Sequence, residues 1–255
     1  MVSLIIPCHN EIKHLKNTIN ESQKTLKENH ESYEILILED GSTDGTTELA
    51  KQIAKNNPNI RHIHSKQRLG KGAALKKGFK HAKGTIIVFI DADASVPPHY
   101  IPDAIEKIRQ GNDICIGKRN PAQRKTHRKL ASITYNWITR RLLETQITDH
   151  QCGLKAFKAE TIKTINTYSR ENGWLWDTEI LALATKQGAS IIEIPVNWTK
   201  REKTSLNLIT DPIKMLTGLL RIRKYTTQMP QNQSQTQWNL LDYSAEEKTA
   251  YTQPT

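Results

Sequence analysis

The chain has 255 residues, 36% of them hydrophobic and 25% charged, and carries a formal net charge of +11. This composition is typical of a globular domain with a packed core and excludes a chain that is disordered throughout. The longest apolar run, residues 86–90, is far shorter than the roughly 18 residues of a membrane-spanning helix. The excess positive charge indicates a polyanionic partner, which composition alone leaves open as nucleic acid, anionic lipid or a phosphorylated substrate.

Neither the cysteines nor the N-terminus indicates an extracellular protein. Cys8, Cys115 and Cys152 are odd in number and form no CxxC pair, which argues against a disulfide framework and a structural zinc site. The first residues, MVSLIIPCHNE, have neither a basic segment nor a long apolar segment and do not resemble a signal peptide. We therefore expect a cytoplasmic protein.

Strand-length apolar runs alternate with helical patterns along the first half of the chain. The strand-like runs cover residues 3–7, 33–39, 59–65, 85–91 and 113–117. Helical patterns follow through Leu15, Ile19 and Leu26, through Leu49, Ile53 and Ala54, over residues 72–82, and after Pro102. Continuous apolar strands separated by helices predict an α/β fold with a mostly parallel sheet covered on both faces.

Three of the predicted strands end in polar and acidic residues. These strand ends are residues 7–11, 39–44 and 91–95. Polar turn residues are common at strand ends, but three successive acidic ends are unusual. Because open α/β sheets bind ligands at the carboxyl ends of their strands, we expect the site at this edge.

Two basic amphipathic helices are predicted, over residues 123–147 and 209–225. The first combines Trp137 and Leu142 with several arginines and lysines, and the second combines Leu216 and Leu220 with Arg223 and its basic neighbours. Such helices can lie in a membrane interface, or they can pack their apolar stripe on the domain and solvate the basic face. Both readings stay open, and the first predicts peripheral contact with the cytoplasmic face of a membrane.

The composition changes after Tyr225. Residues 226–255 are rich in Gln, Thr and Asn and contain one short apolar patch at 238–241. A segment with so little apolar surface is predicted to be a disordered polar tail. The domain proper is therefore expected to span residues 1–225.

The feature most indicative of chemistry is the pair Asp91 and Asp93, separated by Ala92 at the end of the fourth strand. Mg²⁺ and Mn²⁺ prefer oxygen ligands and commonly bind one or two carboxylates together with substrate phosphates. A DxD pair is frequent by chance, but its place at a strand end strengthens the interpretation. We predict that it holds a divalent cation bridging two phosphates.

Two further segments have weaker interpretations. In EDGSTDGT (39–46), Asp40 is placed to accept a hydrogen bond from a nucleobase. Asp-Gly turns also begin many helices, and for this segment taken alone the helix-start interpretation is favoured. In RLGKGAALKKGF (68–79), Lys71 and a helix N-terminus are positioned to contact phosphate oxygens. The segment lacks the spacing of a P-loop, so ATP binding is not predicted.

Together these motifs resemble the family 2 glycosyltransferases with the GT-A fold. The resemblance continues through IGKRN (116–120), ITDHQCGLKAF (147–157), GWLWDTEIL (173–181) and EIPVNWTKREKTSLNL (193–208), and covers roughly residues 2–225. TDHQCGLKAF and PVNWT are similar to the dolichyl-phosphate glucosyltransferase branch and differ from the dolichyl-phosphate mannose synthase branch.

The resemblance implies a Rossmann-like sheet and roles for individual residues. The residues around the base and ribose would be Pro7, His9, Glu11, Leu38 and Asp40. Those at the metal, Mg²⁺ or Mn²⁺, and at the diphosphate would be Asp91, Ala92, Asp93 and Ser95. The cations for donor or acceptor phosphates would be Arg119 and either Lys200 or Arg201. The sugar and acceptor side would be lined by Asp149 and by residues 176–179, including Asp177 and Glu179.

The implied reaction moves a hexose, glucose from UDP-glucose, to a polyprenyl phosphate with inversion at the anomeric carbon. A phosphate acceptor is already anionic and needs little base assistance. A glycan or soluble hydroxyl acceptor would need a carboxylate base, for which Asp177 or Glu179 is the candidate. GDP-mannose as donor also stays open.

The sequence is less consistent with two functions of other classes. A basic nucleic-acid-binding module is not expected, because the basic residues are not interleaved with stacking aromatics and no zinc-finger or RNP-like motif occurs. An inactive nucleotide-sugar binder is disfavoured by the intact carboxylates. Trp174, Trp176 and Trp198 are interpreted as core residues, with Trp176 left open as a sugar platform. The nine histidines show no ligand spacing such as HExxH and are expected at the surface or in turns.

Overall fold

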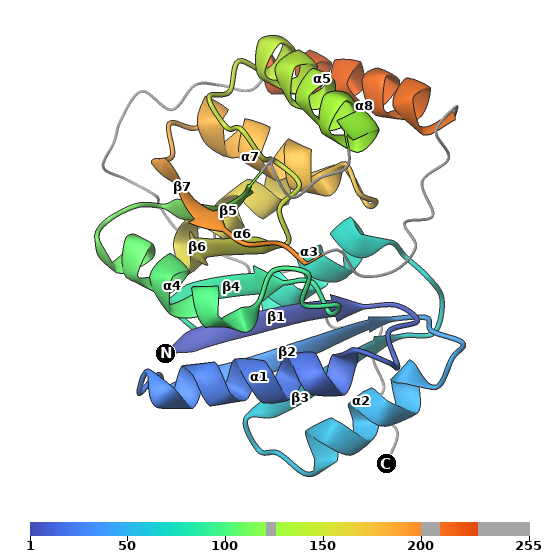
Figure 1. Cartoon of the computed structure of the whole chain (residues 1–255), viewed down its shortest axis with the longest axis vertical. Coiled ribbons are helices and arrows are strands. Elements are labelled where there is room, and N and C mark those ends of the chain that lie inside the picture. Colours follow the sequence, from blue (N-terminus) through green and yellow to red (C-terminus); the bar gives the residue numbers. More distant parts are fainter. Residues whose placement is uncertain (121–125, 200–209, 229–255) are drawn as a thin grey trace, which may run out of the picture.

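The computed structural model of the chain describes residues 1–120, 126–199 and 210–228. Two predictions lie outside the described residues: the phosphate-binding cation, Lys200 or Arg201, and most of the predicted tail, residues 229–255. The described chain forms one mixed sheet with helices on both faces, which confirms the predicted α/β architecture (Figure 1).

Seven strands form the sheet in the spatial order β3-β2-β1-β4-β6-β5-β7. Their bounds are β1 Val2–Cys8, β2 Tyr33–Asp40, β3 Ile60–Ser65, β4 Ile86–Ile90, β5 Ile114–Arg119, β6 Leu154–Lys158 and β7 Ile191–Val196. β6 runs antiparallel to its neighbours β4 and β5, and every other pair is parallel. The sheet is therefore mostly parallel, as predicted. The apolar pattern did not indicate β6, which contains two lysines, or the edge strand β7, which contains a proline.

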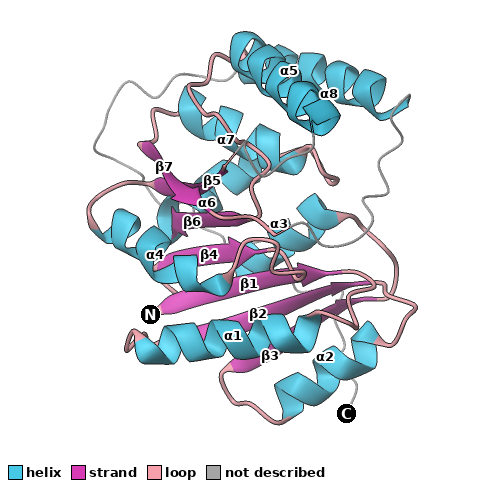
Figure 2. Ribbon diagram, viewed as in Figure 1, coloured by secondary structure: helices cyan, strands magenta, loops and turns pink. Residues whose placement is uncertain are grey.

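Two groups of helices cover the sheet (Figure 2). Their bounds are α1 Leu15–Glu28, α2 Thr46–Lys55, α3 Lys71–His81, α4 Ile101–Arg109, α6 Ala159–Tyr168 and α7 Trp176–Lys186, with a short 3₁₀ turn η1 at Pro98–Tyr100. α1 contacts α2 and α4 on one face, and α3, α6 and α7 contact one another on the other. The predicted apolar stripe of α1 points inward, since Leu15, Ile19 and Leu26 are all buried.

The two predicted basic helices lie side by side outside α7 (Figure 1). They are α5, Thr126–Leu143, and α8, Thr210–Thr226. α5 ends before the predicted residue 147, because Glu144 adopts a positive φ of 54° that is incompatible with a helix. In α8, Leu219, Ile222 and Tyr225 are buried, so one side of this helix packs on the domain. Among the described helices, none combines the length and hydrophobicity needed to cross a bilayer.

The strand order determines where the predicted site residues meet. β2, β1 and β4 are adjacent and parallel, with Cys8 opposite Glu39 and Ile5 opposite Phe89. Their carboxyl ends therefore lie together at one edge of the sheet. The three acidic segments after these strands are brought to a common position, as the sequence predicted.

Candidate active site

A pocket of about 300 Å³ opens at this edge of the sheet. It is lined by Pro7, Cys8, His9, Glu11, Asp40, Arg68, Gly70, Lys71, Ala74, Asp91, Ala92, Asp93, Gly173 and Trp174. Most residues predicted to contact the nucleotide and the metal are thus gathered in one cavity. The exceptions are Leu38, which is buried against α3 beneath Gly78, and Ser95, which lies behind the DxD pair.

Asp40 anchors the loop that leads into α3. Its two carboxylate oxygens accept hydrogen bonds from the backbone N–H groups of Leu69 (2.7 Å) and Gly70 (2.8 Å). Its carbonyl oxygen accepts a bond of 2.7 Å from Nδ1 of His9. Gly41 follows with a φ of +65°, and a Cβ there would lie 2.7 Å from the backbone nitrogen of Arg68. Asp40 therefore shapes the wall of the pocket, in addition to any contact it makes with a base.

The DxD pair is held in a tight turn after β4. The backbone N–H of Asp91 donates to the carbonyl oxygen of Gly153 (3.1 Å), and Oδ1 of Asp93 accepts from the N–H of Ser95 (2.9 Å). A Cβ on Gly153 would lie only 2.3 Å from Oδ2 of Asp91. Gly153, in the motif TDHQCGLKAF, is therefore required for the carboxylate of Asp91 to adopt this position.

Lys71 joins the DxD pair to a buried charge network. Its Nζ lies 3.0 Å from Oδ1 of Asp91 and 2.9 Å from Oδ2 of Asp177. Nζ of Lys155, which is fully buried, donates to Oδ1 of Asp177 (2.6 Å) and to the carbonyl oxygen of Cys152 (2.7 Å). Two lysines and two aspartates are thus linked, and of these four residues Lys71 and Asp91 line the pocket whereas Lys155 and Asp177 lie behind it.

This network shifts the protonation equilibria of its two carboxyls in opposite directions. Burial alone would raise the pKa of Asp177, but the charges of Lys155 and Lys71 outweigh it and hold that pKa below its ordinary value. Burial raises the pKa of Asp91, and the charges of Asp177 and Asp93 add to this effect against Lys71. Asp177 is a stable, doubly paired anion, whereas Asp91 lacks full compensation for its charge.

The donor set fits a divalent cation. Asp91 and Asp93 offer hard oxygen ligands at the pocket, which is the chemistry that Mg²⁺ and Mn²⁺ prefer. The raised pKa of Asp91, caused by burial and by neighbouring carboxylates, reflects a need for positive charge at this position. A cation between the two carboxylates would meet that need, so the residues present fit the predicted metal.

Arg119 is held rigidly by Asp149 beside this region. Nε and one terminal nitrogen of Arg119 donate to the two oxygens of Asp149, at 2.7 and 2.6 Å. The backbone N–H of Asp149 in turn donates to Glu193 of β7 (3.0 Å). Such a bidentate pair fixes the guanidinium plane. Asp149 therefore orients Arg119, whose charge also interacts with Asp91.

Glu179 has a structural role at the start of α7. It is fully buried and accepts hydrogen bonds from Oγ of Ser169 (2.5 Å), the N–H of Arg170 (2.7 Å), the N–H of Glu171 (3.1 Å) and the hydroxyl of Tyr225. These bonds tie the loop before α7 to α8. The carbonyl oxygen of Asn172 in the same loop accepts from the N–H of Ala73 in α3 (3.1 Å). Glu179 thus positions the pocket wall and does not line the pocket.

The structure confirms one expectation for the tryptophans and reverses another. Trp176, interpreted as a core residue but left open as a sugar platform, is fully buried and stacks on Phe79 with ring centroids 5.6 Å apart. Trp174, interpreted as a core residue, is 65% exposed and lines the pocket, with Nζ of Lys71 5.2 Å from its ring centroid. The reason is that α7 begins at Trp176 and turns that side chain inward, whereas Trp174 belongs to the preceding loop.

Sequence reasoning missed Lys155, Arg68 and the role of Gly153. Lys155 stands in the short apolar run LKAF, where a buried lysine requires a buried carboxylate partner. That signal was available, but the partner Asp177 is 22 residues away and only the fold identifies it.

Residues 3–166 match the family described as glycosyl transferase family 2. Glycosyltransferase AglD of Haloferax volcanii is 34% identical over 227 residues, which cover 86% of this chain and 36% of that protein. This chain therefore spans about a third of the length of AglD. The dolichyl-phosphate beta-glucosyltransferase of Saccharomyces cerevisiae is 32% identical over 246 residues, which cover 87% of this chain and 74% of that protein.

A solved structure supports the fold. Glucosyl-3-phosphoglycerate synthase from Mycobacterium tuberculosis, crystallised with Mn²⁺, UDP and glucosyl-3-phosphoglycerate, superimposes with a TM-score of 0.67 at 18% identity. The match covers 90% of this chain and 81% of that one, and it confirms the predicted GT-A fold. With a family match over residues 3–166 and relatives above 30% identity along most of its length, the chain belongs to glycosyl transferase family 2.

Proposed function

We propose that this protein transfers glucose from UDP-glucose to a polyprenyl phosphate, with inversion at the anomeric carbon. The observation that carries the proposal is the pocket in which the DxD pair, Asp91 and Asp93, lies beside Lys71. The relatives named as dolichyl-phosphate beta-glucosyltransferases support the choice of sugar and acceptor. The UDP in the crystal structure of glucosyl-3-phosphoglycerate synthase, which has the same fold, supports the choice of uracil as the base of the donor.

In the proposed reaction, a phosphate oxygen of the acceptor attacks C1 of glucose while the bond from C1 to the diphosphate breaks. UDP leaves with the electron pair of that bond. When bound at Asp91 and Asp93, Mg²⁺ or Mn²⁺ would neutralise the charge that develops on the leaving diphosphate. Lys71, beside Asp91, and Arg119, oriented by Asp149, place positive charge where two anionic substrates must approach each other.

The environment of Asp177 and Glu179 favours a phosphate acceptor. A hydroxyl acceptor needs a base that can take up a proton, and such a base works best with a pKa near the working pH. Asp177 is paired with two lysines that hold its pKa below the ordinary value, after burial is outweighed. Glu179 is enclosed by four donors. Neither is suited to proton uptake, and a phosphate nucleophile requires none.

We also propose peripheral contact with a membrane, where a polyprenyl acceptor resides. Trp137 is 60% exposed on α5, and Leu216 and Leu220 are 44% and 49% exposed on α8. Arg141 is exposed four residues after Trp137, and Arg223 three residues after Leu220, so apolar and basic side chains share one face of each helix. Helices of this kind bind anionic membrane surfaces.

A panel of donors and acceptors tests the proposal. UDP-glucose, UDP-galactose and GDP-mannose are each incubated with Mn²⁺ and either a short polyprenyl phosphate or the matching polyprenol. We expect glucosyl transfer from UDP-glucose to the phosphate only. Transfer to the polyprenol would establish a hydroxyl acceptor, and preferential use of GDP-mannose, with tighter binding of GDP than UDP in calorimetry, would overturn the proposed donor.

A further inference from the structure

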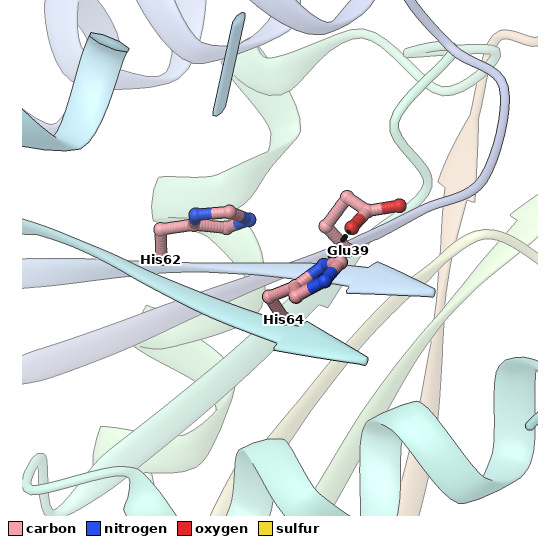
Figure 3. A group of neighbouring side chains, drawn as sticks. All are labelled: Glu39, His62 and His64. Carbon is pink, nitrogen blue, oxygen red and sulfur yellow. Dashed lines mark hydrogen bonds and ion pairs between the residues drawn. The ribbon is translucent and has the colours of Figure 1, made fainter. Parts of the chain in front are cut away.

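A cluster of one carboxylate and two imidazoles lies at the ends of β2 and β3 (Figure 3). Glu39 stands opposite His64 in the parallel pairing of these strands, and His62 precedes His64 by two residues. Residues two apart in a strand point to the same face, so both imidazoles project on the side of Glu39. The potential ligand atoms of these three residues, hereafter the Glu–His–His cluster, all lie within 4.8 Å of one another.

The cluster lies on the face of the sheet opposite the pocket wall formed by Asp40. Glu39 and Asp40 are consecutive in β2, and successive side chains of a strand point to opposite faces. Asp40 bonds to the loop before α3, whereas Glu39 bonds to Ser42 and to Thr47 in the first turn of α2. The Glu–His–His cluster is therefore separate from the DxD pair.

The carboxylate of Glu39 has the orientation and the charge that a metal ligand requires. Oε1 of Glu39 accepts from the N–H of Ser42 (2.6 Å), and Oε2 contacts Nδ1 of His64, so the carboxylate is oriented from both sides. Burial opposes its charge, but the bonds from Ser42, His64 and Thr47 outweigh burial and lower the pKa of Glu39. The carboxylate is therefore anionic at neutral pH.

His62 supplies the observation that a purely structural hydrogen-bond network does not explain. Its Nε2 is buried and has no hydrogen-bond partner within the part of the chain that the structure describes. Burial lowers the pKa of His62, so its imidazole is neutral. A buried polar atom without a partner is unfavourable. A neutral imidazole nitrogen facing an anionic carboxylate and a second imidazole is a typical arrangement for binding a transition metal.

We propose that Glu39, His62 and His64 bind one transition-metal ion of the zinc class, with a remaining position open to solvent. Two imidazoles and one carboxylate are a ligand set that zinc accepts, whereas Mg²⁺ and Ca²⁺ prefer oxygen ligands throughout. One potential ligand atom of each residue already lies within 4.8 Å of the other two, which is close enough for a single ion to be shared after small side-chain movements. Lys51 of α2 places positive charge near His62, so the site is expected to bind more weakly than a closed four-ligand site.

A metal at this position would join the end of β2 to the end of β3. The cluster residue Glu39 is followed by Asp40, and His64 is followed by the loop whose Leu69 and Gly70 bond to Asp40. The ion would therefore stabilise the strand ends that form one wall of the pocket. This inference does not depend on which donor or acceptor the pocket takes.

Calorimetric titration of the full chain with ZnCl₂ tests the proposal. The parent carries Asp93→Asn, which weakens binding at the DxD pair, and His62→Gln and His64→Gln are added to it singly. The matched control is His99→Gln, an exposed histidine on η1 outside the cluster. We expect one equivalent of Zn²⁺ to bind to the parent and to the control, and the affinity to fall by about tenfold or more in each cluster variant.

Thermal unfolding with and without Zn²⁺ gives a second readout. Ligand binding to the folded state raises the melting temperature, so Zn²⁺ should raise the melting temperatures of the parent and the control by more than those of the cluster variants. Equal Zn²⁺ affinity in all four proteins would overturn the proposal, as would the absence of Zn²⁺ binding by the parent. A cluster variant that is less stable than the parent by the same amount with and without Zn²⁺ would assign these residues to hydrogen bonding alone.

Discussion

The ammonium group of Lys71 lies 3.0 Å from Oδ1 of Asp91, inside the pocket where a divalent cation is expected. Asp91 also experiences the charges of Asp177 and Asp93, which together with burial raise its pKa. A divalent cation at the DxD pair and the ammonium group of Lys71 would act on the same carboxylate. Their effects on the stability of the site are therefore coupled, and changing either one tests the charge balance.

Lys71→Met should destabilise the protein, and Mn²⁺ should partly restore its stability. Removing one partner of a buried ion pair leaves uncompensated charge and costs about 3–5 kcal/mol. A divalent cation at Asp91 can supply the missing charge, so Mn²⁺ should raise the melting temperature of Lys71→Met by more than it raises that of the wild type. Lys80→Met, which changes an exposed lysine of the same helix, is the control. An equal Mn²⁺ effect in all three proteins would contradict the coupling.

Asp93→Asn should fold normally and lose most of its transfer activity. The substitution keeps the size of the side chain and removes one negative charge from the metal site. Loss of several kcal/mol of transition-state stabilisation corresponds to a decrease in turnover of roughly a hundredfold to a thousandfold or more. The rate is measured at saturating Mn²⁺, with circular dichroism to establish folding and Asp103→Asn, at an exposed position of α4, as control. Full activity of folded Asp93→Asn, or wild-type activity with a chelator, would exclude the metal-dependent mechanism.

Asp177→Asn should affect stability more than chemistry. Asp177 is the carboxylate partner of fully buried Lys155, at 2.6 Å, so its loss should lower the free energy of unfolding by about 3–5 kcal/mol. With a phosphate acceptor no proton has to be removed, and the turnover of the folded fraction should fall less than in Asp93→Asn. Urea unfolding and single-turnover rates separate the two effects. A folded Asp177→Asn as inactive as Asp93→Asn would instead indicate a catalytic base and a hydroxyl acceptor.

The stability of the protein should decrease in mild acid because of His150. Burial and the charge of Lys155 lower the pKa of His150 to about 4, from 6.5 in the unfolded chain. Below pH 6.5 the unfolded chain takes up a proton that the folded state does not, so stability is fully present above pH 6.5 and declines toward pH 4. Between pH 7 and pH 4.5 this residue should account for about 2 kcal/mol. In urea unfolding His150→Gln should show a shallower pH dependence than the wild type, and an identical slope would refute this assignment.

Binding to anionic vesicles should be weak and sensitive to salt. Each basic side chain near an anionic surface contributes about 1 kcal/mol, and salt screens this attraction. Flotation should succeed with anionic vesicles at low salt, fail at high salt, and be weakened in the double variant Trp137→Ala, Leu220→Ala. Tyr168→Ala removes an exposed aromatic side chain from α6 and serves as control. Failure of the wild type to float at low salt, or salt-independent flotation, would argue against an electrostatic membrane contact.

The sequence by itself determined the architecture and the position of the pocket. Apolar runs and helical periodicities are local properties, and they identified the first five strands, helices α1 to α4 and the two basic helices, but not α6 or α7. The acidic segments after β1, β2 and β4 could be assigned to one edge, because parallel strands align their carboxyl ends. The DxD pair was recognisable because its two carboxylates are neighbours in sequence and need no tertiary contact to meet.

Only the tertiary structure decided which side chains act on one another across the fold. Lys71, Asp91, Lys155 and Asp177 come from four different elements or loops, and their pairing depends on how α3 and α7 dock on β4 and β6. The same docking buries Trp176 and exposes Trp174. Glu39 meets His62 and His64 because β2 and β3 pair in one particular register. Local periodicity specifies the face on which a residue lies, but its partners are set by strand order and helix docking, which are properties of the whole chain.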